Sequence, residues 1–182
     1  NGGEDWDDSM SVYVNDGNNG AIGDAETFSF EVIPVNDQPT ISTGTINMTE
    51  GATDVVTVSE LSFSDVDGSN GQTAYGPNDF DEVNSLTFMV TTGPQYGTLQ
   101  VDTTGSGGWT NLTLNQYYNS AWIAAGRLRY VHDGTENFSD SFNVTVNDNK
   151  GQGNSTNSGT VNVDISPVND RPQLYSKPTE KH

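Results

Sequence analysis

The sequence predicts an all-β protein, an antiparallel β-sandwich that is repeated in tandem. Apolar and polar residues alternate over many short runs, which is the pattern of strands with one buried face. Turn-forming pairs such as Asp-Gly and Asn-Asp separate the runs. The hexapeptide Pro-Val-Asn-Asp-Gln-Pro at residues 34–39 returns as Pro-Val-Asn-Asp-Arg-Pro at 167–172, which indicates an internal repeat. Many short strands joined by polar, Gly-rich turns are typical of a sandwich.

Eight segments carry the strand pattern, and each has its apolar residues at alternate positions. In the first, Met10, Val12 and Val14 share one face, and the other segments follow the same rule. The stretch 112–122 breaks the alternation and is expected to form a short helical turn. The eight predicted strands are residues 9–16, 26–35, 54–60, 85–92, 97–102, 126–133, 140–148 and 159–168.

The repeat sets the expected domain organisation. Residues 4–16 align with 136–148 at an offset of 132, apolar on apolar and acid on acid, and the offset becomes 133 at the closing hexapeptide. We therefore expect one complete unit over 40–170. Residues 1–39 are then the last strands of a preceding unit, and 171–182 are a linker or the start of the next. Two strands cannot bury a face alone, so the first segment should pack on the complete unit, pair with another chain or remain loosely ordered.

Composition and charge limit the function. The formal charge is −19, from 25 acidic and 6 basic residues, which excludes nucleic acid as a partner and disfavours an anionic membrane surface. No run approaches the roughly 18 apolar residues of a membrane-spanning helix, so membrane insertion is not expected. Bound cations would relieve the self-repulsion, although a merely soluble acidic surface is the alternative. The chain has no Cys, and hence no disulfide or thiolate site.

Several motifs resemble those of one repeat family. They are a Tyr-x-His-Asp-Gly turn at 130–134, an Asp-Ser-Phe strand start at 140–142, a Val-x-Asp strand end at 146–148 and the closing Val-Asn-Asp-x-Pro at 168–172. This set resembles the cadherin-like repeat of chondroitin-sulfate-proteoglycan core proteins and Fraser-type matrix proteins, and also the tandem repeats of giant bacterial surface adhesins. The resemblance implies an Ig/cadherin-like sandwich in an extracellular or cell-surface protein, often with Ca²⁺ at the junctions between repeats. The chain is expected to be a piece of such a longer protein.

The resemblance also implies a calcium site at the junction before the complete unit. Asp65 and Asp67 alternate in an extended loop before a Gly, so both carboxylates can converge on one ion. For Asn36 and Asp37, a ligand role and a simple Asx turn both stay open. The usual extra acid upstream of the linker and the second Asn downstream are absent. The predicted metal ligands are Asn36, Asp37, Glu50, Asp65, Asp67 and Asn70.

No catalytic site is expected. The motifs of serine hydrolases and zinc proteases are absent, and His132 and Asp133 are adjacent strand residues that point to opposite faces. His132 is therefore interpreted as a turn or edge residue. Four aromatic residues suggest either a sugar-binding platform or, as we favour, core and loop packing. These are Trp109, Tyr117, Tyr118 and Trp122.

Three functions follow from these observations. The first is a non-catalytic extracellular spacer or adhesion repeat that Ca²⁺ rigidifies, with neighbouring repeats as its partners. The second is a subunit of a filament, a homo-polymer assembled head-to-tail by strand addition. The third is a carbohydrate-binding domain. Five glycosylation sequons occur, about as many as chance gives, at Asn47, Asn111, Asn137, Asn143 and Asn154.

Overall fold

The computed structural model confirms the all-β prediction. The only helix among the described residues is the single turn α1 (Ala121–Ala124), at the end of the stretch expected to be a helical turn. All other elements of that part of the chain are strands, and most of them pair antiparallel. The structure describes residues 7–15, 17, 22–31, 37–65, 86–149 and 155–171.

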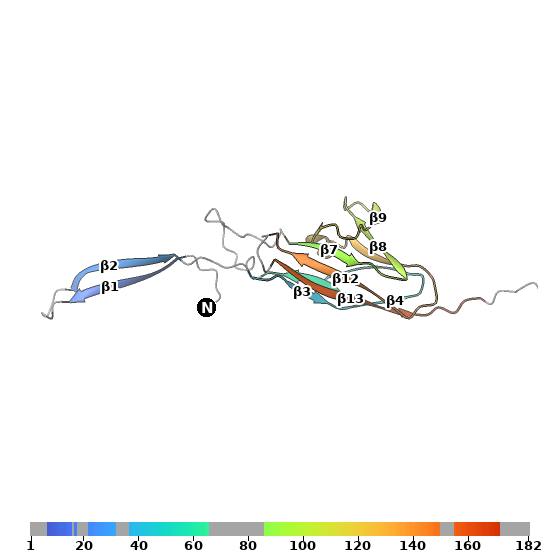
Figure 1. The fold of residues 1–182 in the computed structure, drawn as a ribbon, viewed down its shortest axis with the longest axis horizontal. Coiled ribbons are helices and arrows are strands. Elements are labelled where there is room, and N and C mark those ends of the chain that lie inside the picture. The colour runs from blue at the N-terminus through green and yellow to red at the C-terminus, as the bar shows by residue number, and fades with distance from the viewer. Residues whose placement is uncertain are drawn as a thin grey trace, which may run out of the picture.

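Two main sheets form the sandwich (Figure 1). The five-stranded sheet has the order β10-β7-β12-β13-β4, and β13 and β4 are its one parallel pair. Its strands are β4 (Thr45–Thr49), β7 (Thr87–Thr92), β10 (Tyr118–Asn119), β12 (Ser139–Asn147) and β13 (Thr156–Ser166). The four-stranded sheet has the order β5-β11-β8-β9. Its strands are β5 (Thr53–Val55), β8 (Gly97–Asp102), β9 (Trp109–Asn111) and β11 (Leu128–His132).

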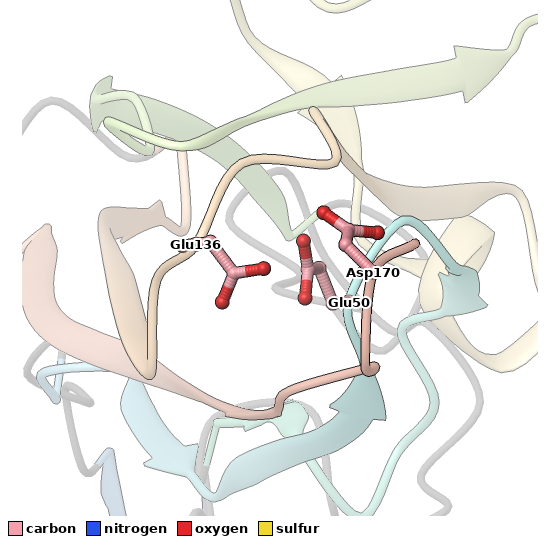
Figure 2. A group of neighbouring side chains, drawn as sticks. All are labelled: Glu50, Glu136 and Asp170. Carbon is pink, nitrogen blue, oxygen red and sulfur yellow. The ribbon is translucent and has the colours of Figure 1, made fainter. Parts of the chain in front are cut away.

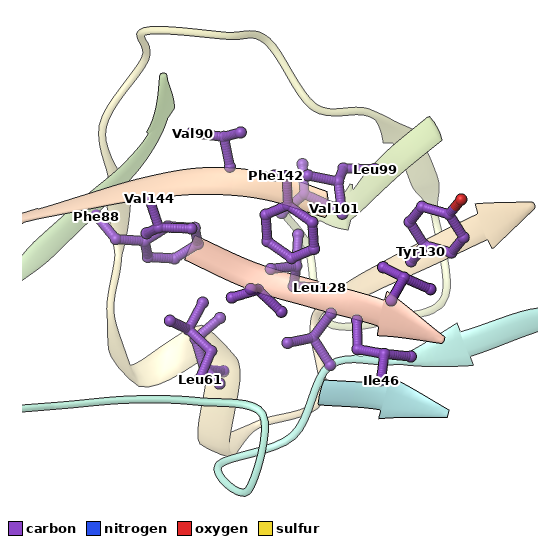
Figure 3. Packing of buried hydrophobic residues seen from close by; sticks show 14 of the residues in the cluster. Ile46, Leu61, Phe88, Val90, Leu99, Val101, Leu128, Tyr130, Phe142 and Val144 are labelled. Carbon is purple, nitrogen blue, oxygen red and sulfur yellow. The ribbon is translucent and has the colours of Figure 1, made fainter. Parts of the chain in front are cut away.

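The core lies between these two sheets and largely follows the period of two along the strands. Along β12, Phe142, Val144 and Val146 are buried while Ser141 and Asn143 are exposed, although Thr145 is buried as well. Burying one face of each strand removes large apolar area from water, which is the main stabilising term of such a domain. Figure 3 shows the cluster from close by. Its largest fully buried side chains include Tyr130, Phe88, Phe142, Ile46, Leu61 and Leu128.

The sequence pattern missed the beginning of the domain. β3 (Thr40–Thr43) pairs with β6 (Leu61–Ser64) in a separate two-stranded sheet, and β4 follows β3 after one residue. Neither β3 nor β4 was predicted, because β3 has one apolar residue and β4 has two, although Ile46 and Met48 of β4 are buried at alternate positions. The strand predicted over 54–60 is also shorter than expected. Thr57 donates its backbone and hydroxyl hydrogens to the Glu60 carboxylate and makes a turn there.

The remaining sheet is a hairpin of β1 (Asp7–Asn15) and β2 (Ile22–Glu31). Figure 1 shows it in blue, beyond one end of the sandwich. Met10 lies opposite Phe28 in this hairpin, and the residues at the equivalent repeat positions, Phe142 and Val161, lie opposite each other in β12–β13. The hairpin therefore reproduces the strand pair and the register that close the complete unit. That residues 1–39 belong to a preceding repeat stays a prediction, as do the other domain boundaries.

Candidate metal site

Three carboxylates gather at the end of the sandwich where β13 finishes. One carboxylate oxygen each from Glu50, Glu136 and Asp170 lies within 4.8 Å of the others (Figure 2). Glu50 follows β4, Glu136 lies in the turn between β11 and β12, and Asp170 follows β13. Carboxylate oxygens are the ligands that Ca²⁺ prefers, so the group is a candidate cation site.

Backbone hydrogen bonds hold two of these segments together. The Glu50 N–H donates to the carbonyl oxygen of Ser166 at 2.9 Å, which continues the parallel pairing of β4 and β13. The Glu50 side chain then accepts a hydrogen bond from the N–H of Val168 at 3.0 Å through Oε2. Glu50 is therefore tied to the chain that carries Asp170, and one of its oxygens already has a donor.

His132 supports the same end of the sandwich from inside. It is the last residue of β11 and only 4% exposed, and its Nδ1 accepts hydrogen bonds from the N–H groups of Gly51 and Gly134 at 3.0 and 3.1 Å. Both glycines have positive φ, 71° and 80°, a backbone conformation that L side chains rarely adopt. One neutral imidazole thus joins the turn after Glu50 to the turn that carries Glu136. The proton must then sit on Nε2, whose nearest carboxylate oxygen is Asp133 Oδ1 at 4.0 Å.

The expectation that His132 is a turn or edge residue is wrong. β11 pairs with β5 on one side and with β8 on the other, so the strand is internal to its sheet. Asp133, the next residue, is exposed and accepts hydrogen bonds from the Thr135 hydroxyl and backbone N–H. These bonds, the hydroxyl first, hold the Asp133 pKa below its usual value. His132 therefore has a structural role inside the sandwich, and Asp133 has one in the exposed turn after β11.

The opposite end of the sandwich carries other predicted ligands. Asp65 follows β6 directly after Ser64, which pairs with Thr40, so Asp65 lies beside the segment that enters the domain. Asp37 lies at the start of that segment, where Gln38 donates to the Thr156 carbonyl at 2.6 Å. Thr156 is the first residue of β13, whereas Glu50 lies beside its last residue.

One predicted grouping is therefore wrong. Glu50 was expected to share an ion with Asp37 and Asp65, but the eleven residues of β13 separate the two ends by roughly 30 Å. Glu50 instead meets Glu136 and Asp170, neither of which was a predicted ligand. The only signal in the sequence was that Asp170 repeats Asp37 at the closing hexapeptide.

Other residues at the entering end also escaped prediction. Asp148 is 1% exposed and follows β12, where its N–H donates to the Ser155 carbonyl. Asp65 is 8% exposed. Two buried carboxylates therefore lie in segments that end near Asp37. The predicted ligands Asn36, Asp67 and Asn70 lie outside the described residues.

The aromatic residues do not form one platform. Tyr118 is 6% exposed and packs between Phe88 and Trp122, with ring centroids 5.8 and 5.9 Å away. Trp109 lies on β9 beneath the Arg129 guanidinium, which is 4.2 Å from the ring centroid. These contacts are those of packing side chains, the role favoured from the sequence.

The sequons differ in accessibility. Asn143 lies on the exposed face of β12 and accepts a hydrogen bond from the Thr160 hydroxyl. Asn47 and Asn111 are also exposed, and Asn137 is half-buried. Asn154 lies outside the described residues, and glycosylation of any of these stays a prediction.

Comparisons with known proteins match most of the chain. A model of the cadherin-like family matches residues 39–165. The chain is 26% identical over 144 residues to the extracellular matrix organizing protein FRAS1 of mouse (Mus musculus), and 26% identical over 146 residues to that of human (Homo sapiens). These matches cover 78% and 80% of this chain but only 3% of each relative. Within the described residues, no helix is both long and apolar enough to cross a membrane.

Proposed function

Because the chain belongs to the cadherin-like family, we propose that it is a non-catalytic structural or adhesion repeat of a larger extracellular protein. The two matrix proteins that it resembles support an extracellular location. We further propose that Ca²⁺ rigidifies the repeat at its ends. The observation that carries this second proposal is the convergence of Glu50, Glu136 and Asp170.

The electrostatics of these carboxylates favour a cation. All three carboxylates are negatively charged, and one oxygen of each lies within 4.8 Å of the others. Each such pair repels by about 1 kcal/mol in water, and more where solvent is partly excluded. A bound Ca²⁺ would turn this repulsion into attraction and would link the segments after β4 and β13 to the turn before β12. The last residues of the domain would then have a fixed direction.

The distribution of carboxylates over both ends suits a repeat in a tandem array. Asp170 lies in the segment that leaves one end of the sandwich. Asp37, its counterpart in the repeat, lies in the segment that enters the other end. Asp65 and Asp148 lie at the entering end. A junction between two such units would therefore combine carboxylates from the leaving end of one unit and the entering end of the next. Neighbouring repeats are the partners that this arrangement supports.

Thermal unfolding of the full chain in Ca²⁺, in Mg²⁺ and in chelator tests this proposal. Ca²⁺ should raise the melting temperature, because it binds the folded state. The free energy of unfolding should rise by about 2.7 kcal/mol when the Ca²⁺ concentration is a hundred times the dissociation constant. Glu136→Gln should weaken the response, because it removes one ligand and leaves the Glu50–Val168 hydrogen bond in place. Glu26→Gln, a change to an exposed residue of β2, is the matched control. Equal melting temperatures in Ca²⁺ and chelator would contradict the proposal.

A second candidate, a filament subunit, is supported by the hairpin. Among the described strands, β1 and β2 pair only with each other, so each has an unpaired edge. Such edges invite strand addition from another chain, and head-to-tail addition that does not close makes a filament. Sedimentation over a wide concentration range tests this function, and a chain that stays monomeric throughout would exclude it.

A further inference from the structure

The hairpin β1–β2 presents an apolar face that its counterpart buries. Met10 and Phe28 are 51% and 52% exposed. Phe142 and Val161, at the equivalent positions of β12–β13, are 1% and 0% exposed. The opposite face is mostly polar, although it also carries Tyr13, and there the hydroxyls of Ser11 and Thr27 hydrogen-bond at 3.3 Å. The hairpin is thus amphipathic like β12–β13, but the apolar face that β12–β13 buries in the core is exposed in the hairpin.

Asp8 adds a polar feature to the same strand. In the complete unit its counterpart Asp140 accepts hydrogen bonds from the Tyr130 hydroxyl and from the N–H groups of Gln95 and Tyr96. Asp140 also accepts the N–H of the next residue, Ser141, at 2.8 Å. Asp8 makes this last bond, from the Ser9 N–H at 2.7 Å. The donors of the other three bonds come from β11 and the turn before β8, and the hairpin contains neither segment.

The unpaired edges of the hairpin indicate which strands a binding partner would place beside it. In the complete unit, β12 pairs with β7 antiparallel and β13 pairs with β4 parallel. The same two edges of β1 and β2 are unpaired among the described strands. A fitting partner therefore brings an antiparallel strand beside β1 and a parallel strand beside β2. It also brings an apolar sheet to cover Met10 and Phe28, and a buried tyrosine to meet Asp8.

We propose that β1–β2 is the closing hairpin of a second sandwich, and that it binds the body of a cadherin-like repeat, the strands equivalent to β3–β11. A second copy of this chain does not supply such a body, because its own β12–β13 already fills the place and buries Phe142 and Val144 there, so the strand addition of the filament candidate would leave Met10 and Phe28 uncovered. The occupant is a repeat body without its own closing hairpin. This inference rests on register and burial and is independent of calcium.

A single introduced thiol tests the inference, because the chain has no Cys. Met10→Cys places the thiol on the apolar face, and Ser9→Cys places a control on the opposite face, at a position equivalent to the exposed Ser141. Each is made in the 182-residue chain and in an extended chain. The extended chain has residues 37–135 ahead of residues 4–182, so that Glu4 takes the place of Glu136 after the β11 turn. The rate of alkylation is measured in all four proteins.

Alkylation of Met10→Cys should be at least about tenfold slower in the extended chain than in the 182-residue chain, while Ser9→Cys reacts alike in both. A graft of residues 7–31 in place of 139–164 tests the same fit within one body, and it should unfold cooperatively with the Met10→Cys thiol protected. Fast alkylation in both the extended chain and the graft would overturn the proposal. Protection in the 182-residue chain that grows with its own concentration would also overturn it, because the occupant would then be a second copy.

Discussion

The Tyr130 hydroxyl donates a hydrogen bond to Asp140 Oδ2 at 2.9 Å, and this contact joins the two sheets of the sandwich. Tyr130 is fully buried on β11 of the four-stranded sheet, and Asp140 is the second residue of β12 in the five-stranded sheet. The same carboxylate accepts the backbone N–H groups of Gln95 and Tyr96, so it also fixes the turn that leads into β8. One side chain therefore satisfies donors from three segments.

Tyr130→Phe should lower the free energy of unfolding by about 1.5 kcal/mol, since it removes one hydrogen bond to a charged acceptor and little volume. Asp140→Ala should cost more, because it removes the acceptor of the Tyr130 hydroxyl and of three backbone N–H groups. Urea unfolding measures both. Tyr117→Phe, at a 45% exposed tyrosine, is the control and should change stability by less than about 0.5 kcal/mol. Equal effects at the two tyrosines would contradict the assigned role.

Tyr130 should also make the domain sensitive to alkali. Burial, and then the hydrogen bond to Asp140, raise the Tyr130 pKa above its ordinary value. A raised pKa means that the folded state favours the protonated form. Its contribution to stability is therefore complete below about pH 10, the pKa of an unfolded tyrosine, and is lost as the pH rises further. Stability of Tyr130→Phe measured from pH 8 to 11 should fall less steeply than that of the wild type. Parallel curves would contradict this prediction.

His132→Ala should destabilise the domain by about 3 kcal/mol, because it leaves a cavity and removes the acceptor of the Gly51 and Gly134 N–H groups. It should also weaken any response to Ca²⁺, since those two turns carry Glu50 and Glu136. Thr98→Ala, at an exposed position of the neighbouring strand β8, is the control. Urea unfolding with and without Ca²⁺ separates the two effects. A variant with wild-type stability would show that the imidazole does not hold the turns.

Asp102 should make the domain sensitive to acid. The N–H of Gly107, the Thr104 hydroxyl and the N–H of Gly105 donate to its carboxylate and hold its pKa below the usual value. Its contribution to stability is therefore present above about pH 4, the pKa of an unfolded Asp, and is lost as the pH falls further. Asp102→Asn should lower the melting temperature at pH 7 and flatten the decline below pH 4. A decline as steep as that of the wild type would contradict the prediction.

The strand pattern could be predicted where alternation places several apolar residues on one face. The segments around Val90, Leu99, Tyr130, Phe142 and Val163 all form the expected strands. β3 and β4 were not predicted in this way, because one apolar residue in β3 and two in β4 are too few to mark a strand, and pairing with β6 and β13 shows them only in the fold. The burial of His132 could not be predicted either, because the two N–H groups that donate to its ring lie on separate turns.

The sequence by itself determined the all-β class and the internal repeat, because a period of two and a repeated phrase are local properties of the chain. The repeated phrase also places one Asp on each side of the unit, Asp37 and Asp170. Only the tertiary structure decided which acidic residues meet. Glu50, Glu136 and Asp170 come from segments far apart in the chain, and the parallel pairing of β4 with β13 brings Glu50 beside the end of β13. The same pairing separates Glu50 from Asp37 and Asp65 by the length of a strand, which no spacing in the sequence could reveal.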